Sequence, residues 1–306
     1  MSAGVGPASA LVATDLDRTL IYSEAAMGAD QFARLDTVCV EIYRGGPLSY
    51  MTTTAVELLA QLAAEVPVVP TTTRSPAQYE RITLPGAPFR HAVVSNGGRI
   101  LVDGEDDADW RRHIERVVIA SGAGLDEMLT ELRRRIDDSW VRSLRTADDL
   151  FCYLVVEPDA QPEAFLPDWR EWCERRGWTA SQQGRKIYTT PRALTKSSAV
   201  AEVRRRLVDD ELLAADARLH AAGDGRLDTD LLSYADLAIR PRHGELESLG
   251  WTIPGLEVTA GTGALAGVEI LEWFLRSVHD PGFTPARSEL TASGPARRDV
   301  RAGGTN

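Results

Sequence analysis

Two aspartates separated by one residue stand directly behind a short apolar run. Asp15 and Asp17 follow Ala10-Leu11-Val12-Ala13, which has the length and composition of a buried strand. Carboxylates that leave the end of a strand this close together repel each other, and a divalent cation between them removes the repulsion. The pair therefore predicts a metal site at which one carboxylate acts as a nucleophile and the other transfers a proton.

Polar residues follow further apolar runs or begin a helix later in the chain. The apolar run 66–69 precedes one group, the helix predicted for 196–208 begins with a lysine, and the run 219–222 leads into an acidic turn. In a parallel sheet the carboxyl ends of the strands share one edge, so we expect these residues to converge there. They are Thr72, Arg74, Lys196, Asp224 and Asp228.

In sequence order, these segments resemble the four motifs of the haloacid dehalogenase (HAD) superfamily. Asp15-Leu16-Asp17-Arg18-Thr19 resembles Asp-x-Asp-x-Thr of motif I, and Thr72 stands where motif II has Thr or Ser. Lys196 resembles the lysine of motif III, and Gly223–Asp228 resembles Gly-Asp-x-x-x-Asp of motif IV. The resemblance covers roughly the first 280 residues, and four ordered motifs are more specific than any one of them.

The resemblance implies a magnesium-dependent phosphomonoesterase that acts on a small phosphorylated metabolite, such as a sugar phosphate. It implies that Asp15 attacks phosphorus to form an aspartyl-phosphate, while Asp17 protonates the leaving alcohol and then activates water. Thr72 and Lys196 would hold the phosphoryl oxygens. The implied Mg²⁺ ligands are Asp15, the backbone carbonyl of Asp17, Asp224 and Asp228.

Two other functions remain open for this set of residues. A phosphosugar mutase would use the same aspartates but pass the phosphoryl group to a second hydroxyl, and the motifs do not separate it from a phosphatase. A non-catalytic regulatory protein of the same fold is the other alternative. The presence of Asp15, Asp17, Lys196 and Asp224 argues against it.

Candidate substrate contacts lie beside the motifs. Arg18 stands where many relatives of the resembled family have Gly, and Arg74 follows motif II. The run 38–50 reads as a hairpin, which would be a flap over the site. The alternative for Arg18 is a solvated residue at a turn, and the alternative for Glu41 and Arg44 is an ordinary hairpin with a solvated edge. The candidates are Arg18, Glu41, Arg44, Arg74 and Asn96.

The order of expected strands and helices predicts an α/β protein with a Rossmann-like parallel sheet, the HAD core, in segments 10–108 and 191–278. The pattern of segment 109–190 predicts a helix followed by two strands, and this unit occurs twice. The segment resembles the α+β cap of the Cof-like and sucrose-phosphatase-like branch. The expected helices are 111–136 and 162–176, and the strands are 140–144, 151–157, 178–182 and 186–190.

The remaining sequence features limit partners and location. Segments 1–9 and 279–306 are expected to be disordered. The net charge of -11 and the pI near 5.0 argue against nucleic acid as a partner. The start of the chain does not read as a signal peptide, and no run is long enough for a membrane helix. Three cysteines without metal spacing indicate reduced thiols, so we expect a cytoplasmic protein, whose oligomeric state the sequence does not indicate.

Overall fold

The computed structural model describes residues 6–280 and 282–284. Most of the two terminal segments expected to be disordered lies outside the described residues. Strand β1 (Ala8–Thr14) begins two residues before the expected start of the core at residue 10, and helix α11 (Ala264–His279) ends one residue after the expected end of the core at residue 278.

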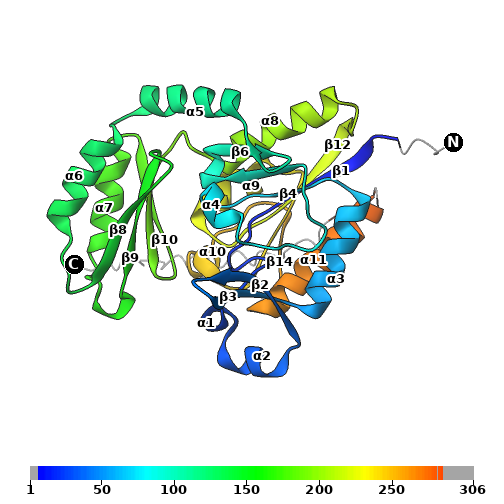
Figure 1. Cartoon of the computed structure of the whole chain (residues 1–306), viewed down its shortest axis with the longest axis horizontal. Helices are drawn as coiled ribbons and strands as arrows, with labels where there is room; N and C mark the ends of the chain where they lie inside the picture. The colour runs from blue at the N-terminus through cyan, green and yellow to red at the C-terminus, as the bar shows by residue number, and fades with distance from the viewer. Residues whose placement is uncertain (1–5, 281, 285–306) are drawn as a thin grey trace, which may run out of the picture.

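The centre of the molecule is a parallel five-stranded sheet with the order β14-β13-β12-β1-β4, shown in Figure 1. β1 pairs with β12 on one side and with β4 on the other. The predicted α/β class with a parallel core sheet is confirmed. The bounds of the other four strands are β4 (Val68–Pro70), β12 (Leu213–Ala222), β13 (Leu237–Arg240) and β14 (Leu256–Val258).

Both faces of β1 are buried, as a parallel sheet covered by helices requires. Leu11 and Ala13 belong to the hydrophobic cluster that contains Val200 of helix α8 (Lys196–Asp209). The alternate residues Ala10 and Val12 pack in a second cluster with α11 and α3 (Thr53–Glu65). Figure 1 shows α3 and α11 together on one side of the sheet. No helix of the described residues is long and apolar enough to cross a membrane.

The remaining elements of the core are short. A two-stranded hairpin and a three-stranded antiparallel sheet flank the central sheet. The hairpin is β2 (Thr37–Tyr43) and β3 (Gly46–Thr52), and the small sheet is β5 (His91–Val94), β6 (Arg99–Val102) and β7 (Glu105–Asp106). The short helices are α1 (Glu24–Met27), α2 (Ala29–Arg34), α4 (Pro76–Tyr79), η1 (Ser95–Gly97), η3 (Arg226–Asp228), α9 (Thr229–Tyr234) and α10 (Gly244–Ser248).

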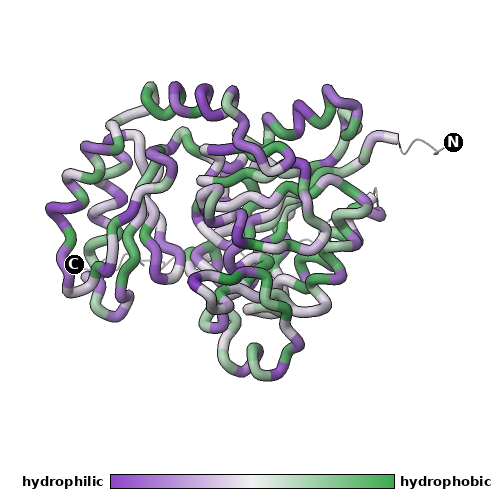
Figure 2. The backbone as a smooth tube through the Cα atoms, in the orientation of Figure 1, coloured by the Kyte–Doolittle hydropathy of each residue, from purple (hydrophilic) through white to green (hydrophobic). Residues whose placement is uncertain are grey.

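The inserted region contains an antiparallel four-stranded sheet with the order β10-β11-β9-β8 and lies beside the core in Figure 1. In Figure 2 the backbone of α5 and α6 alternates between hydrophilic and hydrophobic colours, as amphipathic helices do. The elements are α5 (Ala108–Ser121), α6 (Leu125–Arg135), β8 (Val141–Ala147), β9 (Phe151–Val156), η2 (Pro158–Ala160), α7 (Phe165–Glu174), β10 (Trp178–Gln183) and β11 (Lys186–Pro191).

The single helix expected for 111–136 is wrong, because the chain forms α5 and α6 with a break between them. The break contains Gly122, which packs against the turn after α7. A Cβ at Gly122 would lie 2.1 Å from the carbonyl oxygen of Arg176. Gly122 is extended and Gly124 caps the start of α6, so the two glycines end one helix and begin the next, and Arg176 packs against the break.

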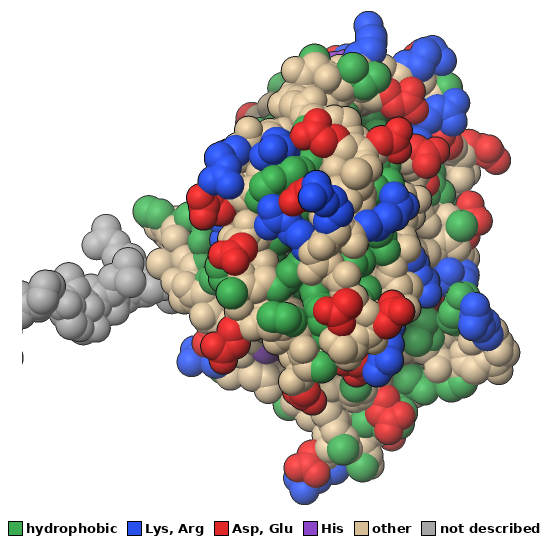
Figure 3. Space-filling view, turned by 90° about the vertical axis from the view of Figure 1, so that its left-hand side faces the viewer, with side chains coloured by type: hydrophobic (Ala, Val, Ile, Leu, Met, Phe, Trp, Pro, Cys, Tyr) green, Lys and Arg blue, Asp and Glu red, His purple; other side chains and the backbone are tan. Residues whose placement is uncertain are grey.

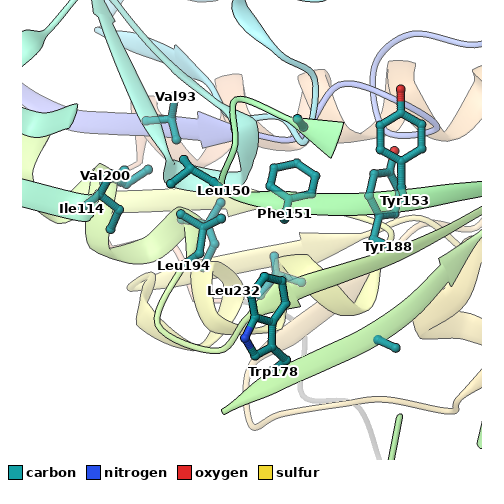
Figure 4. Packing of buried hydrophobic residues seen from close by; sticks show 14 of the residues in the cluster. Val93, Ile114, Leu150, Phe151, Tyr153, Trp178, Tyr188, Leu194, Val200 and Leu232 are labelled. Carbon is teal, nitrogen blue, oxygen red and sulfur yellow. The ribbon is translucent and has the colours of Figure 1, made fainter. Parts of the chain in front are cut away.

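The tryptophans of the cap form its core. Trp140, Trp169 and Trp178 are fully buried, and Trp172 stacks on Trp169 with ring centroids 5.0 Å apart. The hydrophobic cluster that includes them continues into the core, and Figure 4 shows part of it where the cap joins the core. On the cap-side face in Figure 3, basic and acidic side chains are interspersed.

Candidate active site

The polar segments converge at the carboxyl end of the sheet. The backbone N–H of Asp15 donates to the carbonyl of Ala222 at 2.9 Å, which ties the end of β1 to the end of β12. Asp15, Asp224 and Asp228 are buried, and each offers a carboxylate oxygen within 4.8 Å of the others. Gly223 allows this approach, because a Cβ at this position would lie 2.4 Å from the side chain of Asp228.

Lys196 lies between two of these carboxylates. Its Nζ donates to Oδ1 of Asp15 and to Oδ1 of Asp228, each at 2.6 Å, and its side chain is only 1% exposed. Thr195 caps α8 by accepting from the N–H of Ser198, so Lys196 occupies the first turn of the helix. The sequence analysis also predicted Lys196 at the start of this helix.

Asn96 supports the start of α8. Its Nδ2 donates to the carbonyl of Leu194 at 2.9 Å, and Asn96 itself is buried. The next residue, Gly97, packs so tightly that a Cβ would lie 2.1 Å from the carbonyl oxygen of Thr195. The structure thus gives Asn96 a role in holding Lys196, while its predicted contact with substrate stays a prediction.

The carboxylate cluster carries more negative charge than Lys196 neutralises. Burial raises the pKa of Asp15 to about 7 against the opposing pull of Lys196. Burial, together with the carboxylates of Asp15 and Asp228, also raises the pKa of Asp224 well above its ordinary value. Burial alone would lower the pKa of Lys196, but its two carboxylate partners raise it overall. A further cation would therefore be favourable here.

The donor set fits a metal ion. Oδ2 of Asp224 is buried and has no hydrogen-bond partner among the described residues, although Nε of Arg18 lies 3.2 Å away. Three carboxylates that meet around such an atom offer the oxygen ligands that hard divalent cations prefer. The cluster of Asp15, Asp224 and Asp228 is therefore able to hold a metal ion.

Asp17 lies outside this cluster and is held by Arg74. Nε and Nη2 of Arg74 donate to the two carboxylate oxygens of Asp17 at 2.7 and 2.8 Å. Burial acts to raise the pKa of Asp17, but the hydrogen bonds and charge of Arg74 lower it overall. The Asp17 side chain keeps 31% of its surface exposed, so it remains accessible from the space around the site.

Thr72 is fully buried and completes the turn after β4. Its Oγ1 accepts from the backbone N–H of Arg74 at 3.1 Å, and its own N–H donates to the carbonyl of Val93 at 2.8 Å. The neighbouring Thr73 lines the cavity beside Asp15. The sequence analysis did not select Thr73, although its place between two candidate residues was a usable signal.

The hairpin candidates lie in different environments. Both carboxylate oxygens of Glu41 accept hydrogen bonds inside the protein, from Ser49, Arg74 and Arg81. Arg44 lies at the exposed turn of the hairpin, where its guanidinium is 5.2 Å from the centre of the Tyr43 ring. The structure therefore connects Glu41 to the site through Arg74 and does not bring Arg44 to it.

Arg18 adopts an unusual backbone conformation beside the site. Its φ is 63°, in the left-handed region where Gly is favoured. Its carbonyl lies 2.7 Å from Nε2 of His243. Because a non-Gly residue in this region is strained, the side chain near Asp224 is a candidate for a functional role.

The cap supplies residues that the sequence analysis missed. Gln183 donates from Nε2 to Oδ1 of Asp224 at 2.6 Å, and the hydroxyl of Thr73 donates to that of Tyr188 at 3.2 Å. Gln183, Tyr188 and Ser181 line a cavity together with Asp15 and further residues of the core. Strand alternation alone gives no signal for these residues, since their role depends on how the cap packs on the core.

The fold is similar to those of solved phosphatase structures. The chain is 14% identical to a sucrose-phosphatase from Synechocystis sp. PCC6803 in complex with sucrose and phosphate, with a TM-score of 0.56 over 87% of this chain and 98% of that one. For the C-terminal domain of a C. albicans trehalose-6-phosphate phosphatase, the identity is 11% and the TM-score 0.53, over 88% and 98% of the two chains. For a sugar phosphatase of HAD subclass IIB, the sequence identity is 12% and the TM-score is 0.51, over 87% of this chain and 98% of that one.

These likenesses confirm the fold. The chain has the architecture of HAD phosphatases with an inserted cap, and the structural match to subclass IIB extends over most of its length. No protein-family model and no curated protein sequence matches the chain.

Proposed function

We propose that this protein is a magnesium-dependent phosphomonoesterase that acts on a small phosphorylated metabolite, in the first place a sugar phosphate. The observation that carries the proposal is the buried meeting of Asp15, Lys196, Asp224 and Asp228 at the end of the parallel sheet. Such a cluster is costly unless it binds a ligand that uses its charges, and a phosphate with its metal ion does so.

The first half of the reaction breaks the bond to the leaving alcohol. A carboxylate oxygen of Asp15 attacks phosphorus, the bond from phosphorus to the ester oxygen breaks, and Asp17 gives that oxygen a proton. Lys196 and Thr72 hold the phosphoryl oxygens and stabilise their charge. The products of this half are the free alcohol and an aspartyl-phosphate on Asp15.

The second half returns Asp15 to its starting state. Asp17 accepts a proton from water, the water oxygen attacks phosphorus, and the bond between phosphorus and the Asp15 oxygen breaks, which releases inorganic phosphate and the Asp15 carboxylate. Asp15, Asp224, Asp228 and the backbone carbonyl of Asp17 would hold Mg²⁺. When bound, that ion reduces the repulsion between the phosphate dianion and the carboxylates.

A small substrate is supported by the space between cap and core. Asp15 and Lys196 line a cavity of only about 10 Å³, and Gln183 and Glu245, which also line it, border an adjoining hollow of about 510 Å³ together with Arg18 and Arg170. The volume of the hollow is in the range of small-molecule sites. The phosphatases similar in fold are named for sucrose, trehalose-6-phosphate and sugar, which favours a sugar phosphate here. The expected cytoplasmic location agrees with such a metabolite.

A phosphosugar mutase is the second candidate, because it would use Asp15 and Asp17 in the same way. A non-catalytic regulatory protein is the third, and it gives no reason for the buried charges around Lys196. Release of inorganic phosphate from a sugar monophosphate separates the first two candidates.

The proposal is tested by a screen of phosphorylated metabolites with Mg²⁺, in which released phosphate is measured. Asp15→Asn keeps the shape of the side chain but removes its negative charge, so it should lower turnover by several orders of magnitude while the protein stays folded. Formation of a sugar phosphate isomer without free phosphate would favour the mutase. Turnover near that of the unmodified protein in the Asn variant would remove Asp15 from its proposed role.

A further inference from the structure

We propose that Glu41 is a positioning residue for proton transfer. Through Arg74 it holds the carboxylate of Asp17 in the orientation needed to protonate the leaving alcohol. The inference rests on the proposed phosphatase function, and it assigns to the hairpin β2–β3 a part in the reaction other than contact with substrate.

The first observation is a bulge in β2 that turns Glu41 inward. The pairing of β2 with β3 shifts register on both sides of Glu41. Val40 and Glu41 are therefore both buried, whereas their neighbours Cys39 and Ile42 are exposed. Regular alternation would send one of two consecutive side chains to each face, and a bulge re-aims a side chain in this way.

The second observation is that Glu41 makes a full set of internal hydrogen bonds. The residue is 1% exposed. Its Oε2 accepts from Oγ of Ser49 at 2.7 Å, and its Oε1 accepts from Nη1 of Arg74 at 2.8 Å and from Nη2 of Arg81 at 3.1 Å. Both carboxylate oxygens of Glu41 are therefore engaged in hydrogen bonds that orient other protein side chains.

The third observation is the way Arg74 joins two carboxylates. One side of its planar guanidinium faces Glu41, while Nε and Nη2 form a bidentate pair with Asp17. Contacts on two sides fix both the position and the plane of the group. Each oxygen of Asp17 has further acceptor capacity, so the pair with Arg74 leaves room for a proton.

The consequence for the reaction follows from geometry. A proton donor works only when its oxygen lies within hydrogen-bond reach of the leaving oxygen. Without Glu41, Arg74 keeps only Asp17 as an anionic partner. The paired side chains of Arg74 and Asp17 can then change orientation together relative to the leaving oxygen. Proton transfer should then suffer, while attack by Asp15 should be preserved, since Glu41 contacts neither Asp15 nor Lys196.

The test compares two leaving groups in Glu41→Gln. Para-nitrophenolate leaves phosphorus without needing a proton, whereas an alkoxide from a sugar phosphate needs one. The quantity to measure is kcat/KM, because it reports the steps up to release of the leaving group and excludes hydrolysis of the aspartyl-phosphate. We expect a loss of about 100-fold for the sugar phosphate and less than about 3-fold for para-nitrophenyl phosphate.

Two further variants keep the test decisive. Arg74→Lys retains a positive charge but loses the bidentate geometry, and it should show the same dependence on the leaving group even if Glu41→Gln fails to fold. Glu202→Gln is the matched control, because Glu202 also accepts from two arginines, Arg205 and Arg206, but on α8 away from Asp17. It should leave both kcat/KM values unchanged.

The outcomes separate this inference from the proposed function. A wild-type protein inactive on both substrates would contradict the phosphatase function and the inference with it. An active wild type whose Glu41→Gln and Arg74→Lys variants lose equally on both substrates, or lose nothing, would overturn the role of Glu41 alone.

Discussion

Replacing Lys196 by Met tests whether this lysine neutralises the carboxylate cluster. The ammonium is 1% exposed and makes 2.6 Å contacts with Asp15 and Asp228, whose side chains are 5% and 2% exposed. Removing one partner of a buried ion pair costs roughly 3–5 kcal/mol, because the remaining charge is left without compensation. We expect the free energy of unfolding of Lys196→Met to fall by about this amount, with activity lost as well.

The loss of stability is measured by urea unfolding monitored by circular dichroism. The slope m, the dependence of the unfolding free energy on urea concentration, is compared between variants. The chain contains only two lysines, Lys186 and Lys196, so ¹⁵N labelling of lysine gives two side-chain signals. The Lys196 signal should exchange slowly with solvent, since its ammonium is buried and paired on both sides. Its absence from Lys196→Met assigns it.

Lys186→Met is the control for charge removal. The ammonium of Lys186 lies 5.8 Å from the centre of the Tyr153 ring and 6.0 Å from that of Tyr188, a weaker type of contact. We expect it to cost about 1 kcal/mol or less. If Lys196→Met lost no more stability than this control, the contacts of Lys196 with the two carboxylates would not be a buried ion pair, and the charge argument for the site would fail.

Three further predictions follow from other features of the site and the core. Arg18 has a φ of 63°, so Arg18→Gly should be more stable than Arg18→Ala by about 1 kcal/mol in urea unfolding, although both lose the ion pair with Asp224. Burial lowers the pKa of His220 to about 4, so the unfolded chain binds a proton that the folded chain resists. Stability should therefore fall by about 3 kcal/mol as pH drops from about 6.5 to about 4, and His220→Gln should lose most of this dependence. Mg²⁺ should raise the unfolding temperature of the wild type but not of Asp224→Asn, and a shift that persists in the variant would contradict the metal site.

Much of the fold could be predicted because its signals are local. The apolar run before Asp15 is buried on both faces of β1, and a continuous run of this kind is typical of a central parallel strand. The strands of the cap were predicted to within about three residues for the same reason. The break at Gly122 was missed although Gly122 and Gly124 gave a local signal for it, because the apolar pattern on both sides was interpreted as one helix.

The same distinction applies to the site. Asp15, Lys196, Asp224 and Asp228 were predicted together, and the structure brings them together. The sequence analysis placed Glu41 on the hairpin, as the structure does, and proposed a substrate contact for its side chain. Only the bulge beside it shows that its side chain turns toward the protein interior.

The proposed roles of Asp15 and Asp17 require a change in protonation when substrate binds. The pKa of Asp15 is raised by burial, whereas a nucleophile needs its ionised form, and the pKa of Asp17 is lowered by Arg74, whereas a proton donor needs its protonated form. A metal ion beside Asp15 favours the ionised nucleophile. A phosphate dianion beside Asp17 adds a second negative charge near Arg74 and favours protonation of the carboxylate. In the proposed mechanism, metal binding would thus increase the ionised fraction of Asp15, and substrate binding would increase the protonated fraction of Asp17.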